Sequence, residues 1–133
     1  MATVMLTTKT GKHEFQAELA LTPEAQAKGL MFRKTMLENH GMLFVFDPPR
    51  EAAFWMHNTP LPLDILFIAQ DCTIHRLVQK TTPLSQTLIP SNGIVAGVLE
   101  LNAGTAEAIG LFAGDRIETD KLPGCSNIPS ARY

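Results

Sequence analysis

The chain has 133 residues, of which 45% are hydrophobic and 18% are charged, and its formal net charge is −2 at pH 7. This length suits one hydrophobic core, and the composition is that of a folded globule, which excludes a disordered chain. The small negative charge supplies no broad attraction for nucleic acid or anionic lipid. We therefore expect a single domain over residues 1–133 that binds no nucleic acid.

The strand signals run through the whole chain. Short apolar or β-branched runs that end at Gly, Pro, Asn or Asp predict a mainly β fold of about eight strands. These strands are expected over residues 3–8, 13–20, 41–47, 52–58, 63–69, 73–80, 94–101 and 115–119. The first two flank the sequence KTGK and are predicted to form a hairpin.

Two short helices interrupt the strands. Thr22 is suited to cap a helix that begins at Pro23 and ends at Gly29. A second helix is predicted over residues 105–109, because glycines flank a run of good helix formers. Neither helix is long enough to organise the fold.

No segment is suited to cross a membrane as a helix. The longest stretch without acidic or basic residues runs from Thr81 to Leu99, and prolines and glycines interrupt it. Residues 1–12 lack the order of basic, apolar and small residues that marks a secretory signal. We therefore expect no transmembrane segment, and the localisation does not follow from these residues.

The two cysteines, Cys72 and Cys125, lie far apart and form no CxxC or Cys/His ligand motif. The spacing excludes a zinc knuckle and a thioredoxin-type motif, and we expect no metal and no cofactor. One disulfide is an alternative, but two unrelated thiols are the simpler interpretation, because pairing does not follow from sequence. Cys125 lies in the tail, residues 120–133, which is predicted to be a surface strap or a loose end.

The candidate site begins at the only tryptophan. On an extended chain Phe54 and Met56 share one face, and Trp55 and His57 share the other. The first face is expected in the core. The second is either another buried layer or the floor of a pocket, because an indole beside an imidazole suits stacking and hydrogen bonding.

Two acids within apolar runs, Asp64 and Glu100, leave two interpretations open. An unpaired carboxylate there is costly or becomes protonated. In the functional interpretation they converge near His57, Asn58 and Arg33, as an acid/base pair or as cation ligands. In the structural interpretation, which we favour, each acid is tied to a backbone N–H or to an arginine.

Other positions add little chemistry. Asp115 follows a glycine beside apolar sequence, which is also ordinary turn chemistry. An asparagine before a proline-rich turn, as at Asn58, commonly caps its own backbone. The chain contains no GxSxG, GxxxxGK[ST], GxGxxG or HExxH motif, so covalent catalysis is unsupported.

Several motifs follow one another along the chain: KGLMFR (28–33), GMLFVF (41–46), FWMHNT (54–59), PLDILFI (62–68), VLEL (98–101) followed by AG (103–104), and Gly110 with Gly114 and Asp115. In this order and spacing they resemble the DUF192 family of small uncharacterised bacterial and archaeal proteins. The resemblance covers about residues 26–118. It implies a jelly-roll-like β-sandwich or barrel with short helices, in a protein that is often exported and therefore periplasmic.

The same resemblance implies that the unusual residues of this chain have a role shared within the family. It does not choose between a functional site and a structural network for them. The positions it carries over are Arg33, residues 54–56, Asn58, Asp64, Glu100 and Asp115. The family usually has Lys where this chain has His57, so a required lysine nucleophile is not expected there, whereas a hydrogen-bonding role survives the change. The cysteines match no family motif, which supports their being incidental.

The preferred hypothesis is a small polar ligand or a protein partner bound in a cleft near Trp55, His57, Asn58 and Asp64. One alternative is a hydrolase or lyase that uses Asp64 and Glu100 as its acid/base pair. Another is a protein-interaction domain without a small-molecule pocket. The predicted ligand-binding residues are Arg33, Trp55, His57, Asn58, Asp64, Glu100 and Asp115.

Overall fold

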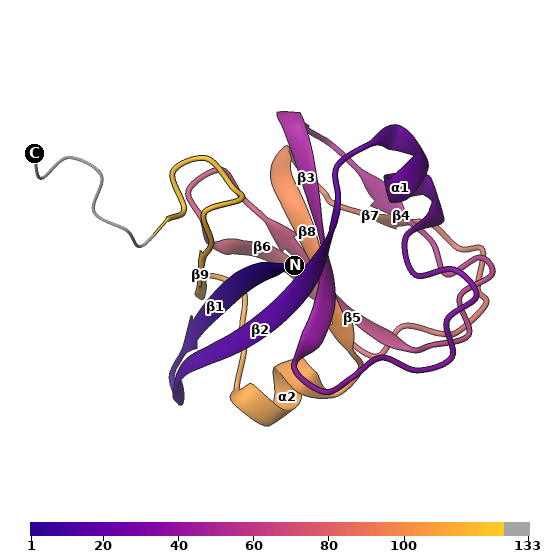
Figure 1. The fold of residues 1–133 in the computed structure, drawn as a ribbon, viewed down its shortest axis with the longest axis horizontal. Coiled ribbons are helices and arrows are strands. Elements are labelled where there is room, and N and C mark those ends of the chain that lie inside the picture. Colours follow the sequence, from indigo (N-terminus) through magenta and orange to yellow (C-terminus); the bar gives the residue numbers. More distant parts are fainter. Residues whose placement is uncertain (127–133) are drawn as a thin grey trace, which may run out of the picture.

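The computed structural model describes residues 1–126. Within these residues the chain forms nine strands and two short helices (Figure 1), so the prediction of a mainly β fold is confirmed. The elements are β1 (Ala2–Thr8), β2 (Gly11–Ala20), α1 (Pro23–Lys28), β3 (His40–Arg50), β4 (Ala53–Phe54), β5 (Leu63–Ile68), β6 (Ile74–Val78), β7 (Ile89–Pro90), β8 (Val95–Asn102), α2 (Thr105–Ile109) and β9 (Arg116–Glu118).

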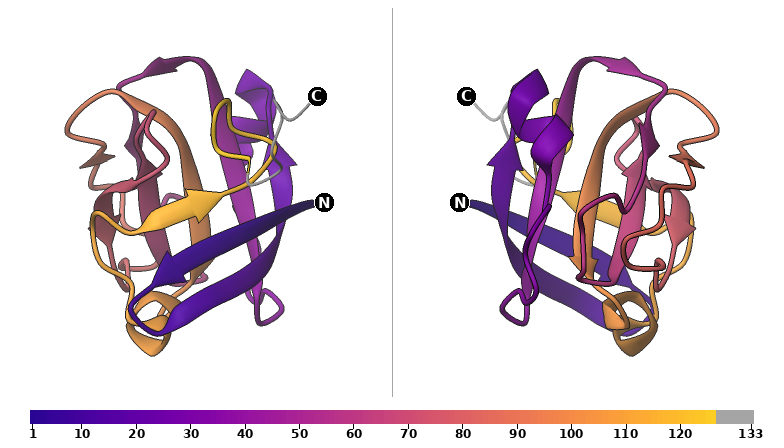
Figure 2. Two further views of the ribbon diagram at one scale, coloured as in Figure 1. Left: turned by 90° about the vertical axis from the view of Figure 1, so that its left-hand side faces the viewer. Right: turned by 90° about the vertical axis from the view of Figure 1, so that its right-hand side faces the viewer.

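Seven strands form one sheet in the order β6-β5-β8-β3-β2-β1-β9, and β4 and β7 pair separately. β2 and β3 are parallel, and the other neighbours in the large sheet are antiparallel. The sheet curls into a half-barrel (Figure 2), so that β9 returns toward the beginning of β6. Backbone contacts join these two edges: Thr73 bridges Arg116, and the Ile117 N–H donates to the Cys72 carbonyl at 2.9 Å.

The large sheet is covered on both faces, which explains why β5 and most of β8 are fully buried. Residues of one face come from every strand of the sheet and fill the inside of the half-barrel. Among them are Val4, Phe15, Leu43, Leu66, Ile74, Leu99 and Ile117. Residues of the outer face come from β3, β5 and β8 and pack under α1, β4 and the adjoining loops; Met42, Phe44, Leu63, Ile65, Phe67 and Val98 are among them.

Most of the expected elements appear, with different lengths. The predicted β1–β2 hairpin forms, and the Thr22 hydroxyl caps α1 by accepting from the Ala25 N–H at 3.1 Å. The strand expected over residues 52–58 shrinks to β4, because the chain turns and Asn58 takes a φ of 54°. The short strand β7 was not expected. Of the predicted tail, residues 127–133 lie outside the described residues.

The interpretation of the cysteines as unrelated thiols is wrong. Cys72 and Cys125 form a disulfide with 5.5 Å between their Cα atoms, and both side chains are buried. The bond depends on the curl of the sheet, because β9 and the turn after it bring Cys125 against the start of β6. The Thr119 N–H donates to the Cys125 carbonyl at 2.9 Å, which attaches this part of the tail to the sheet.

Candidate ligand-binding site

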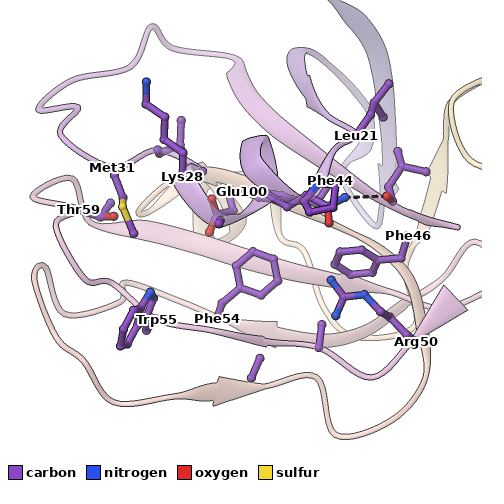
Figure 3. Close-up of a pocket in the computed structure, with 18 of the residues that line it drawn as sticks. Leu21, Lys28, Met31, Phe44, Phe46, Arg50, Phe54, Trp55, Thr59 and Glu100 are labelled. Atoms are coloured by element: carbon purple, nitrogen blue, oxygen red, sulfur yellow. Dashed lines mark hydrogen bonds between the residues drawn. The ribbon is translucent and has the colours of Figure 1, made fainter. Parts of the chain in front are cut away.

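A cavity of about 530 Å³ lies between the outer face of the sheet and the layer that covers it (Figure 3). Its walls come from β3, β8, α1 and residues 52–59. Most of the lining side chains are apolar or aromatic, including Leu21, Leu30, Met31, Phe44, Phe46, Phe54, Trp55, Met56 and Leu63. A concave, largely apolar site of this volume is typical of small-molecule binding.

One buried acid, Glu100, lines this cavity. It pairs across the sheet with Met42 of β3 and Ile65 of β5, so it faces the outer layer. The residue is only 4% exposed, and its carboxyl makes no hydrogen bond or ion pair with any residue between 1 and 126. Burial raises the pKa of Glu100 to about 8, so the carboxyl holds its proton at neutral pH.

Neither of the basic residues that line the cavity, Lys28 and Arg50, forms an ion pair with Glu100. The Arg50 guanidinium lies 4.2 Å from the ring centroid of Phe46, and it donates to the Glu51 carbonyl at 3.2 Å. Figure 3 shows Phe54 between Glu100 and Arg50, and the Lys28 ammonium extends away from the carboxyl. The carboxyl therefore faces the cavity with apolar neighbours and no counter-ion.

We expect Glu100→Gln to change how stability depends on pH. Between the ordinary value of 4.5 and the raised pKa of about 8, the unfolded chain loses a proton that the folded chain retains. The wild-type free energy of unfolding should therefore fall as pH rises through this window, by roughly 1 kcal/mol per pH unit relative to the variant. Urea unfolding at several pH values measures the difference.

The matched control is Glu38→Gln, because Glu38 is exposed and its side chain makes no hydrogen bond or ion pair within residues 1–126. Its stability should follow the wild-type curve at every pH. Wild-type and Glu100→Gln curves that run parallel from pH 4.5 to 8 would contradict the raised pKa.

Of the residues predicted from sequence, Trp55 and Glu100 line the cavity. Trp55 is 43% exposed, and its ring contacts the His57 ring with 4.7 Å between centroids and a tilt of 39° between the ring planes. His57 itself lies outside the cavity lining, and its Nδ1 accepts from the Gln86 amide at 3.0 Å. Asn58 occupies the turn, where its carbonyl accepts from the Phe32 N–H at 2.7 Å.

The structure does not bring Asp64 and Glu100 together. Asp64 pairs across the sheet with Leu101, whereas Glu100 pairs with Ile65, so the two carboxyls point to opposite faces. Asp64 is fully buried, and its two oxygens accept from the backbone N–H groups of Lys80 and Ala106, each at 2.9 Å. This arrangement ties the end of β6 and the start of α2 to β5.

Arg33 and Asp115 also have structural partners. Arg33 forms a two-pronged ion pair with Glu18, with 2.8 Å between Nη2 and Oε1. The guanidinium of Arg33 holds the pKa of Glu18 below its usual range. Asp115 accepts from the Phe112 N–H at 2.8 Å, which is the turn chemistry that its glycine neighbour indicates.

Sequence reasoning missed most of the cavity. Phe54 was expected only in the core, and Arg50 was not singled out. The available signal was the apolar character of both faces of β3 and β8, which indicates a second layer outside the sheet. That signal does not show where the second layer leaves a gap.

A family model decides the relationship of the chain to other proteins: the DUF192 model, described as "Uncharacterized ACR", matches residues 5–119. The chain belongs to the DUF192 family. The resemblance drawn from the motifs is thereby confirmed and extends toward the N-terminus. No curated protein matches this DUF192 chain.

Two solved structures are similar to this DUF192 protein. A Sinorhizobium meliloti protein, described as a candidate transcription regulator, is 46% identical with a TM-score of 0.87, and the match covers 91% of this chain and 95% of that one. A Novosphingobium aromaticivorans protein of unknown function is 41% identical with a TM-score of 0.85, covering 87% and 83%.

Within residues 1–126 of the DUF192 chain, no three His, Cys, Asp or Glu side chains come together as metal ligands. The helices formed by these residues are too short or too polar to span a bilayer.

Proposed function

We propose that this protein binds a small organic molecule in the cavity between the sheet and α1, with Glu100 as the polar contact. The observation that carries the proposal is the Glu100 carboxyl, which is buried at a cavity wall without a partner among the described residues. A buried polar group without a hydrogen bond costs about 1–3 kcal/mol of stability. A ligand that hydrogen-bonds to Glu100 offsets this cost.

The cavity lining favours an amphipathic ligand. The aromatic rings of Phe44 and Phe54 meet edge to face with 4.9 Å between centroids, and they offer fixed apolar walls to the body of a ligand. Trp55 extends this surface toward solvent. The proposal therefore moves the site from His57, Asn58 and Asp64 to the Glu100 cavity, while keeping a small ligand as the occupant.

A catalytic role for Glu100 alone is a second candidate. A carboxyl with a pKa of about 8 in an apolar cavity has the property that a general acid or base needs near neutral pH. The pair of Asp64 and Glu100 is not proposed, because these carboxyls face opposite sides of the sheet. The regulatory description of the S. meliloti protein is not carried over, because a net charge of −2 gives no broad attraction for DNA.

A thermal-shift screen tests the proposal with the wild-type chain, Glu100→Gln and the control Glu38→Gln. We expect amphipathic metabolites of one chemical class to raise the Tm of the wild type and of the control by several degrees at saturating concentration. Glu100→Gln should lose most of that shift. Because Trp55 is the only tryptophan and lines the cavity, its fluorescence reports binding independently.

The screen contradicts the proposal if no amphipathic class shifts the wild type, or if the shift is equal in all three proteins. Turnover of a bound compound by the wild type, lost in Glu100→Gln with binding retained, would favour the catalytic candidate. Binding without turnover favours a binding protein.

The disulfide supports the exported location that the family resemblance implies. Disulfides persist in oxidising compartments such as the periplasm and are rare in the reducing cytosol. The buried Cys72–Cys125 bond therefore fits a periplasmic ligand-binding protein.

A further inference from the structure

We infer that the cavity selects organic cations, namely amines whose ammonium group contacts Glu100 and whose apolar body lies among the aromatic side chains. The inference rests on the proposed small-molecule function and deepens it by naming the chemical class of the ligand. It stands on two features of the cavity: the distribution of charge and the aromatic walls.

The charge distribution favours a cation at the inner end of the cavity. Four charged residues line it, and of these Glu100 is buried whereas Lys28, Asp47 and Arg50 are exposed. Arg50 is engaged by Phe46 and by a backbone carbonyl, and Glu100 forms no ion pair within residues 1–126. A ligand ammonium forms an ion pair with Glu100 when the carboxyl gives up its proton, whereas the ionised carboxyl would repel a ligand anion.

The aromatic walls favour the same ligand class. Cations are attracted to the faces of aromatic rings, with a benefit that grows when the cation is desolvated. Arg50 already uses the face of Phe46 in this way, at the outer end of the cavity. Phe44, Phe54 and Trp55 remain as lining rings that carry no cation within the described residues.

Binding of an ammonium group should release a proton. Glu100 holds its proton near neutral pH because burial raises its pKa to about 8. Its cross-strand neighbours Met42 and Ile65 are uncharged, and the charged groups facing the cavity from α1 and β3 are Lys28, Asp47 and Arg50. The protonated carboxyl and the ammonium ion give a carboxylate–ammonium pair and one proton, which passes to the buffer.

The test uses three probes with one apolar body: 2-phenylethylamine, 2-phenylethanol and 3-phenylpropanoate. Titrations followed by Trp55 fluorescence and calorimetry at pH 6, 7 and 8 measure affinity and proton release. We expect the amine to bind best and, from the ionised fraction of a group with a pKa of about 8, to bind roughly fiftyfold more tightly at pH 8 than at pH 6. The alcohol should bind weakly and independently of pH.

Three variants show which group is responsible. Glu100→Gln should remove the pH dependence and weaken amine binding at pH 8 by about tenfold or more, and urea unfolding confirms that this variant is folded. Glu38→Gln should behave as the wild type. His57→Gln should keep the pH profile, because His57 lies outside the cavity lining.

The following results would overturn the inference. If the alcohol or the propanoate binds as tightly as the amine, or if amine affinity is equal at pH 6 and pH 8, the site does not select cations although it still binds small molecules. Failure of the amine to bind at pH 8 also overturns the inference. The metabolite screen then judges the small-molecule function separately.

Discussion

Reducing the disulfide of the wild-type chain, or replacing Cys72 and Cys125 with alanine, is expected to lower the free energy of unfolding by about 4 kcal/mol, the chain-entropy value for a sequence separation of 53 residues. The open chain gains conformational freedom in the unfolded state, so the equilibrium moves toward unfolding. The bond also joins the turn after β9 to the residues just before β6, so its loss releases this edge of the half-barrel. Urea unfolding with and without reductant measures the change.

The reduced wild type and the double alanine variant serve as controls for one another. The reduced wild type keeps both sulfur atoms in the core, so its difference from the double alanine variant reports lost packing alone. The double variant should be indifferent to reductant. Equal unfolding midpoints for the oxidised and the reduced wild type would show that the bond contributes nothing to stability.

Asp64→Ala is expected to destabilise the fold by about 3 kcal/mol, because it leaves two backbone N–H groups without their acceptor and each such loss costs about 1–3 kcal/mol. Those donors, Lys80 and Ala106, lie after β6 and at the start of α2, and the Asp64 carboxyl ties both backbone segments to β5. Asp64→Asn should show a smaller loss, because its amide keeps one acceptor oxygen. Urea unfolding gives the stability, and hydrogen exchange shows whether α2 amides lose protection.

Asp120→Ala is the matched control, since Asp120 is exposed and its side chain makes no hydrogen bond or ion pair within residues 1–126. Its stability should stay within about 0.5 kcal/mol of the wild type. A similarly small effect of Asp64→Ala would mean that the carboxyl is not structural, and the functional interpretation of Asp64 would regain support.

Glu100 and Asp64 show how far sequence reasoning reached. Both were recognised as acids within apolar runs, where an unpaired carboxylate is costly, and this reasoning holds for each. The expectation that they converge required knowledge of strand register. The pairing of Asp64 with Leu101, and of Glu100 with Ile65, assigns one acid to a structural network and the other to a cavity.

The sequence by itself determined the features that depend on neighbouring residues: the mainly β class from alternation and turn residues, the α1 cap from Thr22 and Pro23, and the DUF192 family from ordered motifs. Only the tertiary structure decided the Cys72–Cys125 bond, the separation of the two acids and the cavity beside Glu100. The physical reason is that these features depend on strand register and on the curl of the sheet. Both arise from contacts between distant residues, and local periodicity carries no information about them.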